Sequence, residues 1–139
     1  VTFCREFADK AHHYKEEHVM FGLLAQKHDG KIDSQIEKHR LQHEQCRDLV
    51  HAMSVALESY ARGEEAGRTA LHRNAMDYVS ILRRHIHSED EIFFPMVEVF
   101  LNDAEGDALL REFEKYEGKA GGRFSEEGRA IVQELAAEL

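Results

Sequence analysis

The stretch His85-Ile-His-Ser-Glu-Asp-Glu-Ile-Phe-Phe-Pro95 sets His85 and Glu89 four residues apart inside a long stripe of apolar residues. Apolar residues that recur every three or four positions lie on one face of an α-helix, and such a face packs against other helices in a bundle. Burial of an ionised carboxylate without a partner costs several kcal/mol, so a buried Glu89 requires a compensating cation. The stripe consists of Leu71, Ala75, Tyr78, Leu82, His85, Glu89, Ile92, Met96 and Val99.

Helix-forming residues dominate the chain, and its one proline and clustered glycines mark the breaks between helices. The first long helix is expected to end at His28-Asp29-Gly30, where Gly30 suits a left-handed cap. Pro95 is expected to bend or loosen the third long helix, because proline removes a backbone donor. We therefore predict an all-α protein with helices over about residues 3–27, 33–62, 67–100 and 102–116, and a last amphipathic helix from Ser125 after a glycine-rich link over 118–122.

Pairs of metal-ligand side chains interrupt the apolar stripes of all three long helices. A single pair of this kind is common on an exposed helix face, where it contributes a few tenths of a kcal/mol. Three pairs on three apolar stripes indicate a shared metal site inside a bundle. Imidazole and carboxylate donors suit iron, manganese or zinc, and bridging carboxylates favour a dinuclear centre. The pairs are His12 with Glu16, His39 with His43, and His85 with Glu89.

Length and charge exclude several other classes of function. The chain has 139 residues, 27 of them acidic and 18 basic, and a formal net charge of -9. Nucleic acids and anionic membranes attract basic surfaces, so neither is an expected partner. No apolar run approaches the roughly 20 residues of a membrane span. Only two cysteines and no signal peptide are present, and a reducing cytoplasm is the expected compartment.

The signature motifs resemble those of the hemerythrin-like (HHE cation-binding) family, whose four-helix bundles hold a non-haem di-iron centre. The resemblance covers about Phe3 to Phe100. It rests on the stretches His12-His-Tyr-Lys-Glu-Glu, His39-Arg-Leu-Gln-His43-Glu and His85-Ile-His-Ser-Glu-Asp with the Phe-Phe-Pro that follows. The resemblance implies an iron pair bridged by Glu16 and Glu89, with zinc or manganese as substitutes. The ligands that it implies are His12, Glu16, His39, His43, His85 and Glu89.

Some ligand positions stay open. His13 and Glu17 form a second pair four residues apart, and this pair could replace or join His12 and Glu16. Oxygen-carrying members of the family place an aspartate five residues after the last histidine. Asp90 has that spacing from His85 and is an alternative to Glu89. The glutamate form looks more like the iron-sensing and iron-centre-repair branches.

The family normally carries a further histidine ligand on a helix before the one that holds His12, and no such helix precedes Phe3 here. We therefore expect an up-down four-helix bundle whose first helix is missing from this chain. An additional N-terminal helix, or a second copy in a homodimer, is expected to cover the open side. Residues 1–101 are the expected bundle, and residues 102–139 a C-terminal helical extension packed on it.

The expected function is a di-iron protein that binds dioxygen or a related molecule such as nitric oxide, as a sensor, store or carrier. Iron-centre repair, iron donation, or nitric oxide and peroxide stress chemistry at the same site is the alternative. A metal-free helical interaction module is an alternative from another class. No acid, base or nucleophile beyond the metal ligands stands out, so a binding role is favoured over an enzyme.

Overall fold

The structure is a computed structural model, and it describes residues 1–27, 30–119 and 123–137. All regular structure in these ranges is helical, which confirms the predicted all-α class. The chain forms two compact units, one of Gly30–Val97 with Val1 and the other of Thr2–Asp29 with Glu98–Leu139. The division into residues 1–101 and 102–139, and a further helix before Phe3, stay predictions. Within the described ranges, no helix is both long and apolar enough to cross a membrane.

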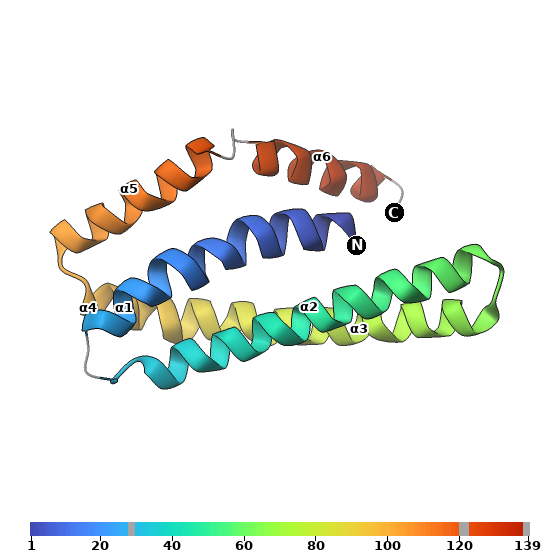
Figure 1. The fold of residues 1–139 in the computed structure, drawn as a ribbon, viewed down its shortest axis with the longest axis horizontal. Coiled ribbons are helices and arrows are strands. Elements are labelled where there is room, and N and C mark those ends of the chain that lie inside the picture. The colour runs from blue at the N-terminus through green and yellow to red at the C-terminus, as the bar shows by residue number, and fades with distance from the viewer. Residues whose placement is uncertain (28–29, 120–122, 138–139) are drawn as a thin grey trace. The chain divides into compact units, whose positions relative to one another are not determined.

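A helical hairpin forms most of the first unit. Helix α2 (Asp33–Ala61) and helix α3 (Glu65–Ser88) run side by side in opposite directions (Figure 1). Gly63 turns the chain between them with φ of 81°, a conformation that residues with a Cβ rarely adopt. At Gly67 the helices approach so closely that a Cβ would lie 2.3 Å from the backbone nitrogen of Tyr60. Glycine at this position therefore permits the close contact.

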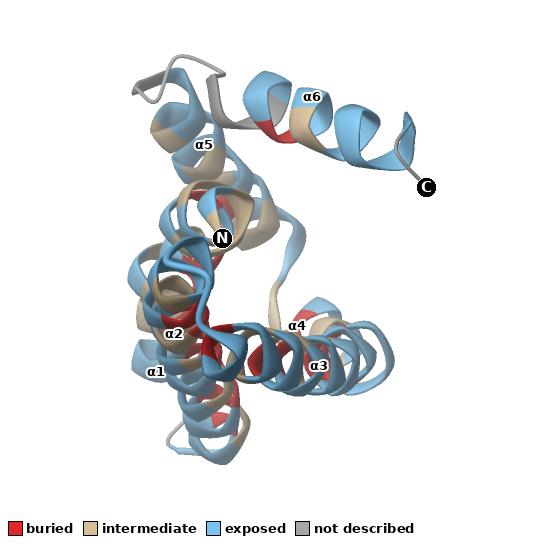
Figure 2. Cartoon of the chain, turned by 90° about the vertical axis from the view of Figure 1, so that its right-hand side faces the viewer, coloured by how far each residue is buried: buried red, intermediate tan, exposed pale blue. Residues whose placement is uncertain are grey.

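In α2 the apolar stripe, which recurs every three or four residues from Ile32 to Tyr60, is buried along most of its length. Its apolar members and both of its histidines are covered, whereas the last two, Leu57 and Tyr60, are about half exposed. Figure 2 colours the buried positions red. The periodicity of three and four residues thus correctly identified the packed face of this helix. The buried members are Ile32, Ile36, His39, His43, Cys46, Val50 and Met53.

A π-helical turn continues α3 and carries a site residue. The segment η3 (Glu89–Phe93) is followed by α4 (Phe94–Phe100), which contains Pro95. A π-helical hydrogen bond spans five residues instead of four, so the turn advances the chain by an extra residue. As a result Phe93 and Val97 are buried, whereas the predicted stripe residue Ile92 is exposed. The expected loosening near the proline is this turn.

The second unit begins with one helix that is mostly π-helical. It comprises η1 (Cys4–His13), η2 (Glu16–Met20) and α1 (Phe21–Lys27). The wider turns again displace the packed face. Regular helical spacing from His12 and Glu16 leads to Val19 and Leu23, which are half-buried, whereas Met20 and Leu24 are buried. His28 and Asp29, at the predicted end of the helix, lie outside the described residues. Gly30 has the expected left-handed conformation, with φ of 83°.

The C-terminal helices pack on this first helix. Helix α5 (Asp103–Lys119) contacts η2, and α6 (Arg123–Ala137) contacts η1. Helix α5 begins with a capping box, since the side chains of Asn102 and Glu105 each accept a hydrogen bond from the other's backbone N–H, at 3.1 and 3.0 Å. The hydroxyl of Tyr116 donates to the carbonyl of Lys10 at 2.8 Å. Residues 120–122 of the predicted glycine-rich link lie outside the described residues.

Candidate metal centre

The α2–α3 hairpin brings two of the predicted histidines into contact. The Nε2 atoms of His43 and His85 lie 3.2 Å apart, and both side chains are buried. Their ring centroids are 4.7 Å apart, with an angle of 76° between the ring planes. The antiparallel course of the helices places the two residues at the same height. Both rings therefore present an Nε2 atom to a common point.

Glu89 adds a carboxylate at the same point. Its Oε1 atom lies 3.0 Å from Nε2 of His85, one turn earlier on the same helix. One ligand atom from each of His43, His85 and Glu89 can be chosen so that all of them lie within 4.8 Å of one another. Glu89 is buried and opens the π-helical turn η3, whereas Asp90 is exposed. This geometry favours Glu89 over Asp90 as the carboxylate donor.

His39 forms the far side of the cluster. Its ring centroid is 5.5 Å from that of His85 and 4.6 Å from that of Phe93, and its side chain is fully buried. Nδ1–H of His39 donates to the backbone carbonyl of Gln35 at 2.7 Å. A carbonyl only accepts, so this bond places the proton on Nδ1, and in the neutral ring the lone pair is then on Nε2. A metal-binding histidine is commonly held in this way.

Burial controls the protonation of His39. Loss of solvent lowers the pKa of its imidazole below the ordinary value of 6.5, and the nearby His85 and His43 act in the same direction. The hydrogen bond to Gln35 and the charge of Glu89 oppose this shift with smaller effects. Burial therefore favours the neutral imidazole, which is the form that binds metals.

Two further hydrogen bonds join α2 to α3 beside the cluster, and both include a residue that was not a predicted ligand. Nδ1–H of His85 donates to Oε1 of Gln42 at 3.2 Å. One turn away, the ammonium of Lys38 donates to the hydroxyl of Ser88 at 2.9 Å. Each bond involves a residue adjacent to a predicted ligand. The signal was available only once the register of the two helices was known.

The remaining predicted ligands lie in the second unit. His12 and Glu16 are neighbours across one turn, with 3.6 Å between Nε2 and Oε1. Glu16 is buried, but the His12 side chain is 46% exposed. The adjacent His13 is only 2% exposed and lies 3.5 Å from the carboxylate of Asp9. Glu17 is half-buried. His13 thus has the burial that was expected of His12.

The donor set of the first unit fits a transition metal. Two imidazoles and one carboxylate converge, with the ring of His39 beside them, in a region from which water is largely excluded. Such donors suit iron, zinc and manganese. The hydrogen bonds of His39 and His85 through Nδ1 leave Nε2 as the coordinating atom of both rings. The residues present are therefore compatible with a bound cation.

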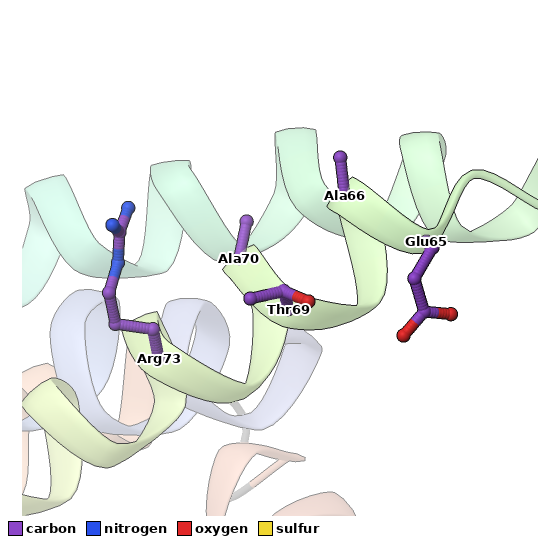
Figure 3. Close-up of a pocket in the computed structure, with 5 residues that line it drawn as sticks. All are labelled: Glu65, Ala66, Thr69, Ala70 and Arg73. Carbon is purple, nitrogen blue, oxygen red and sulfur yellow. The ribbon is translucent and has the colours of Figure 1, made fainter.

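A surface hollow on α3 is unrelated to this cluster. It has a volume of about 440 Å³ and is lined by Glu65, Ala66, Thr69, Ala70 and Arg73 (Figure 3). Arg73 is twelve residues before His85, or about 18 Å along an α-helix. Neither histidine nor cysteine contributes to the lining. The hollow lacks the donors of a transition-metal site.

Comparison with known proteins identifies the family. Three uncharacterised proteins, one from Mycobacterium bovis and two from Mycobacterium tuberculosis, are 26% identical over 135 residues, which is 97% of this chain and 51% of each relative. The chain thus spans about half the length of the curated relatives that it matches. No solved structure matches it. The model of the hemerythrin HHE cation-binding domain matches residues 1–97, so this helical chain belongs to the hemerythrin HHE cation-binding family.

Proposed function

We propose that the chain holds a pair of iron ions and binds a small diatomic molecule such as dioxygen or nitric oxide, as a sensor, store or carrier. The observation that supports this proposal best is the buried cluster of His43, His85 and Glu89, with His39 beside it. Iron, when bound, would supply a redox-active centre with an open coordination position. Zinc and manganese suit the same donors and are possible substitutes.

Each ligand has a defined role in the proposal. His39 and His85 would bind through Nε2, because hydrogen bonds occupy their Nδ1 atoms, and His43 presents its Nε2 atom to that of His85. Glu89 would offset the positive charge of the metal with its buried carboxylate. Glu16 lies in the second unit, where its side chain is buried, and its role as a ligand stays a prediction from the sequence.

The sequence also predicts a histidine ligand on the first helix. His12 is the predicted ligand, and the burial of His13 supports that residue instead. Single alanine variants decide between them, since only the true ligand weakens iron binding when it is removed. An iron affinity equal to that of the wild type in both variants would exclude a histidine ligand from this helix.

The direct test is a metal assay on protein purified without added metal, followed by iron loading. We expect about two irons per chain, as a dinuclear carboxylate-bridged centre requires. Less than a stoichiometric amount of any transition metal after loading would contradict the proposal. The optical spectrum before and after exposure to air then tests the role of the centre. A charge-transfer band that disappears when oxygen is removed supports reversible binding, whereas bleaching with iron release supports iron donation or repair.

A further inference from the structure

Gln42 contacts the cluster without being a candidate ligand. It precedes His43 on α2, and its Oε1 atom accepts the Nδ1–H of His85 from α3 at 3.2 Å. Gln42 is half-buried, whereas His85 is almost fully buried. Helix α2 therefore contacts the His85 ring at both nitrogens, since His43 faces Nε2 and Gln42 faces Nδ1.

The two edges of the His85 ring have competing acceptors. Glu89 Oε1 lies 3.0 Å from Nε2, and a carboxylate at that distance favours a proton on Nε2. Gln42 Oε1 favours the proton on Nδ1 instead. Only the second arrangement leaves the Nε2 lone pair free to bind a metal. The amide oxygen of Gln42 thus disfavours the tautomer of His85 whose proton is on Nε2, which cannot bind a metal through that atom.

The same bond fixes the orientation of the ring. The His85 ring is edge-on to its neighbours, at 76° to His43 and 60° to His39. Rotation about its side-chain bonds would move Nε2 away from the point where the His43 and Glu89 donors meet. One turn along the hairpin, the bond from Lys38 to Ser88 also joins α2 to α3. The two bonds hold the helices in register at the level of the ligands.

We propose that Gln42 is a positioning residue of the metal centre, which holds the proton of His85 on Nδ1 and directs Nε2 at the metal. This inference rests on the proposed metal-binding function. An oxygen that orients a ligand histidine in this way typically contributes about 10-fold to 100-fold to metal affinity. The role belongs to the oxygen atom, so a residue of similar length without it should not replace Gln42.

The test compares the affinities of four proteins for Zn²⁺ and Fe²⁺, measured by competition with a chelator of known affinity. Gln42→Met keeps the length of the side chain and removes the oxygen, and we expect about 10-fold to 100-fold weaker binding. Gln42→Glu retains an acceptor and should stay close to the wild type. Gln45→Met makes the same change at an exposed position of α2 and should have no effect. Unchanged affinity in Gln42→Met, or the full loss in Gln42→Glu, overturns the inference.

Nuclear magnetic resonance of the Zn²⁺-loaded wild type gives a readout that does not depend on the variants folding. The ¹⁵N spectrum should show a protonated Nδ1 on His85 whose hydrogen exchanges slowly with solvent. Rapid exchange, or coordination through Nδ1, overturns the inference. If the wild type binds neither Zn²⁺ nor Fe²⁺, both the proposed function and the role of Gln42 are wrong. A wild type and Gln42→Met that bind equally well reject only the role of Gln42.

Discussion

The Nε2 atoms of His43 and His85 lie 3.2 Å apart although 42 residues separate the two histidines in the chain. Two buried imidazoles that face each other through the same nitrogen share one hydrogen bond at most, whereas a metal ion can accept both lone pairs. Glu89 lies 3.0 Å from one of these nitrogens and supplies the negative charge. Substitution of His43 or His85 is therefore the most direct test of metal binding.

Replacement of His43 or His85 by alanine should abolish metal binding at physiological concentrations. Each variant removes a ligand atom, so its affinity should fall by more than the about 10-fold to 100-fold expected for loss of an orienting partner. His51→Ala and His87→Ala are the matched controls, because both histidines are exposed on the same two helices. Metal content after dialysis provides the measurement. Equal metal content in all four variants would exclude the cluster as the site.

The close approach at Gly67 predicts a large difference between two glycine substitutions. Gly67→Ala would place a Cβ 2.3 Å from the backbone nitrogen of Tyr60, and we expect a loss of about 1–3 kcal/mol in the free energy of unfolding. Gly106→Ala, in α5, meets no atom within 4 Å. A glycine inside a helix is less stable than alanine by about 0.5–1 kcal/mol, so this variant should be neutral or more stable. Urea unfolding of the metal-free proteins provides the comparison.

A Gly67→Ala protein as stable as the wild type would show that α2 and α3 separate at this turn without cost. A destabilised Gly106→Ala protein would show instead that α5 requires a glycine for a reason other than space.

Hydrophobic periodicity predicted the helices and most of the packed face of α2, because that helix keeps the regular α-helical spacing that such patterns assume. It failed where the spacing changes. After Glu89 the π-helical turn moves the buried positions to Phe93 and Val97, so the predicted stripe through Ile92 and Val99 is exposed. Sequence patterns contain no direct signal for an extra residue in a turn.

The grouping of several candidate ligands could be predicted for a related reason. His39, His43 and His85 interrupt apolar stripes, and the structure places them together with Glu89. Nothing in the local sequence distinguishes His12 from His13, since the phase of a π-helical segment decides which of them is buried. The contact of Gln42 depends on the register between two helices and could not be read from either one alone.

Metal removal should destabilise the protein. A cation that binds only the folded chain stabilises it by about 2.7 kcal/mol when its concentration is 100 times the dissociation constant. Without it, the buried donors of His43, His85 and Glu89 remain close together with no central charge. We expect a lower thermal midpoint after chelation in the wild type and in His51→Ala, and no change in His85→Ala. A midpoint that stays constant while the metal is demonstrably removed would argue against a buried site.

The metal-free protein should lose stability on acidification, because burial lowers the pKa of His39 below its ordinary value of 6.5. Between the lowered pKa and 6.5 the unfolded chain binds a proton on this residue and the folded chain does not. The free energy of unfolding should therefore rise with pH through that window. The contribution of His39 should be complete above pH 6.5 and should be lost as the pH drops toward the lowered pKa. Acid should weaken metal binding as well, since protons compete for the same nitrogen.

Urea unfolding over a series of pH values measures this dependence, and His39→Gln removes the titrating group while it keeps a polar side chain. The slope of unfolding free energy against pH should be shallower in His39→Gln than in the wild type. His51→Gln should retain the full slope, because His51 is exposed on the same helix. If the wild type is equally stable on both sides of pH 6.5, or if His39→Gln keeps the entire slope, His39 is not held neutral by burial in the folded chain. In that case the fold does not prepare this imidazole for a metal.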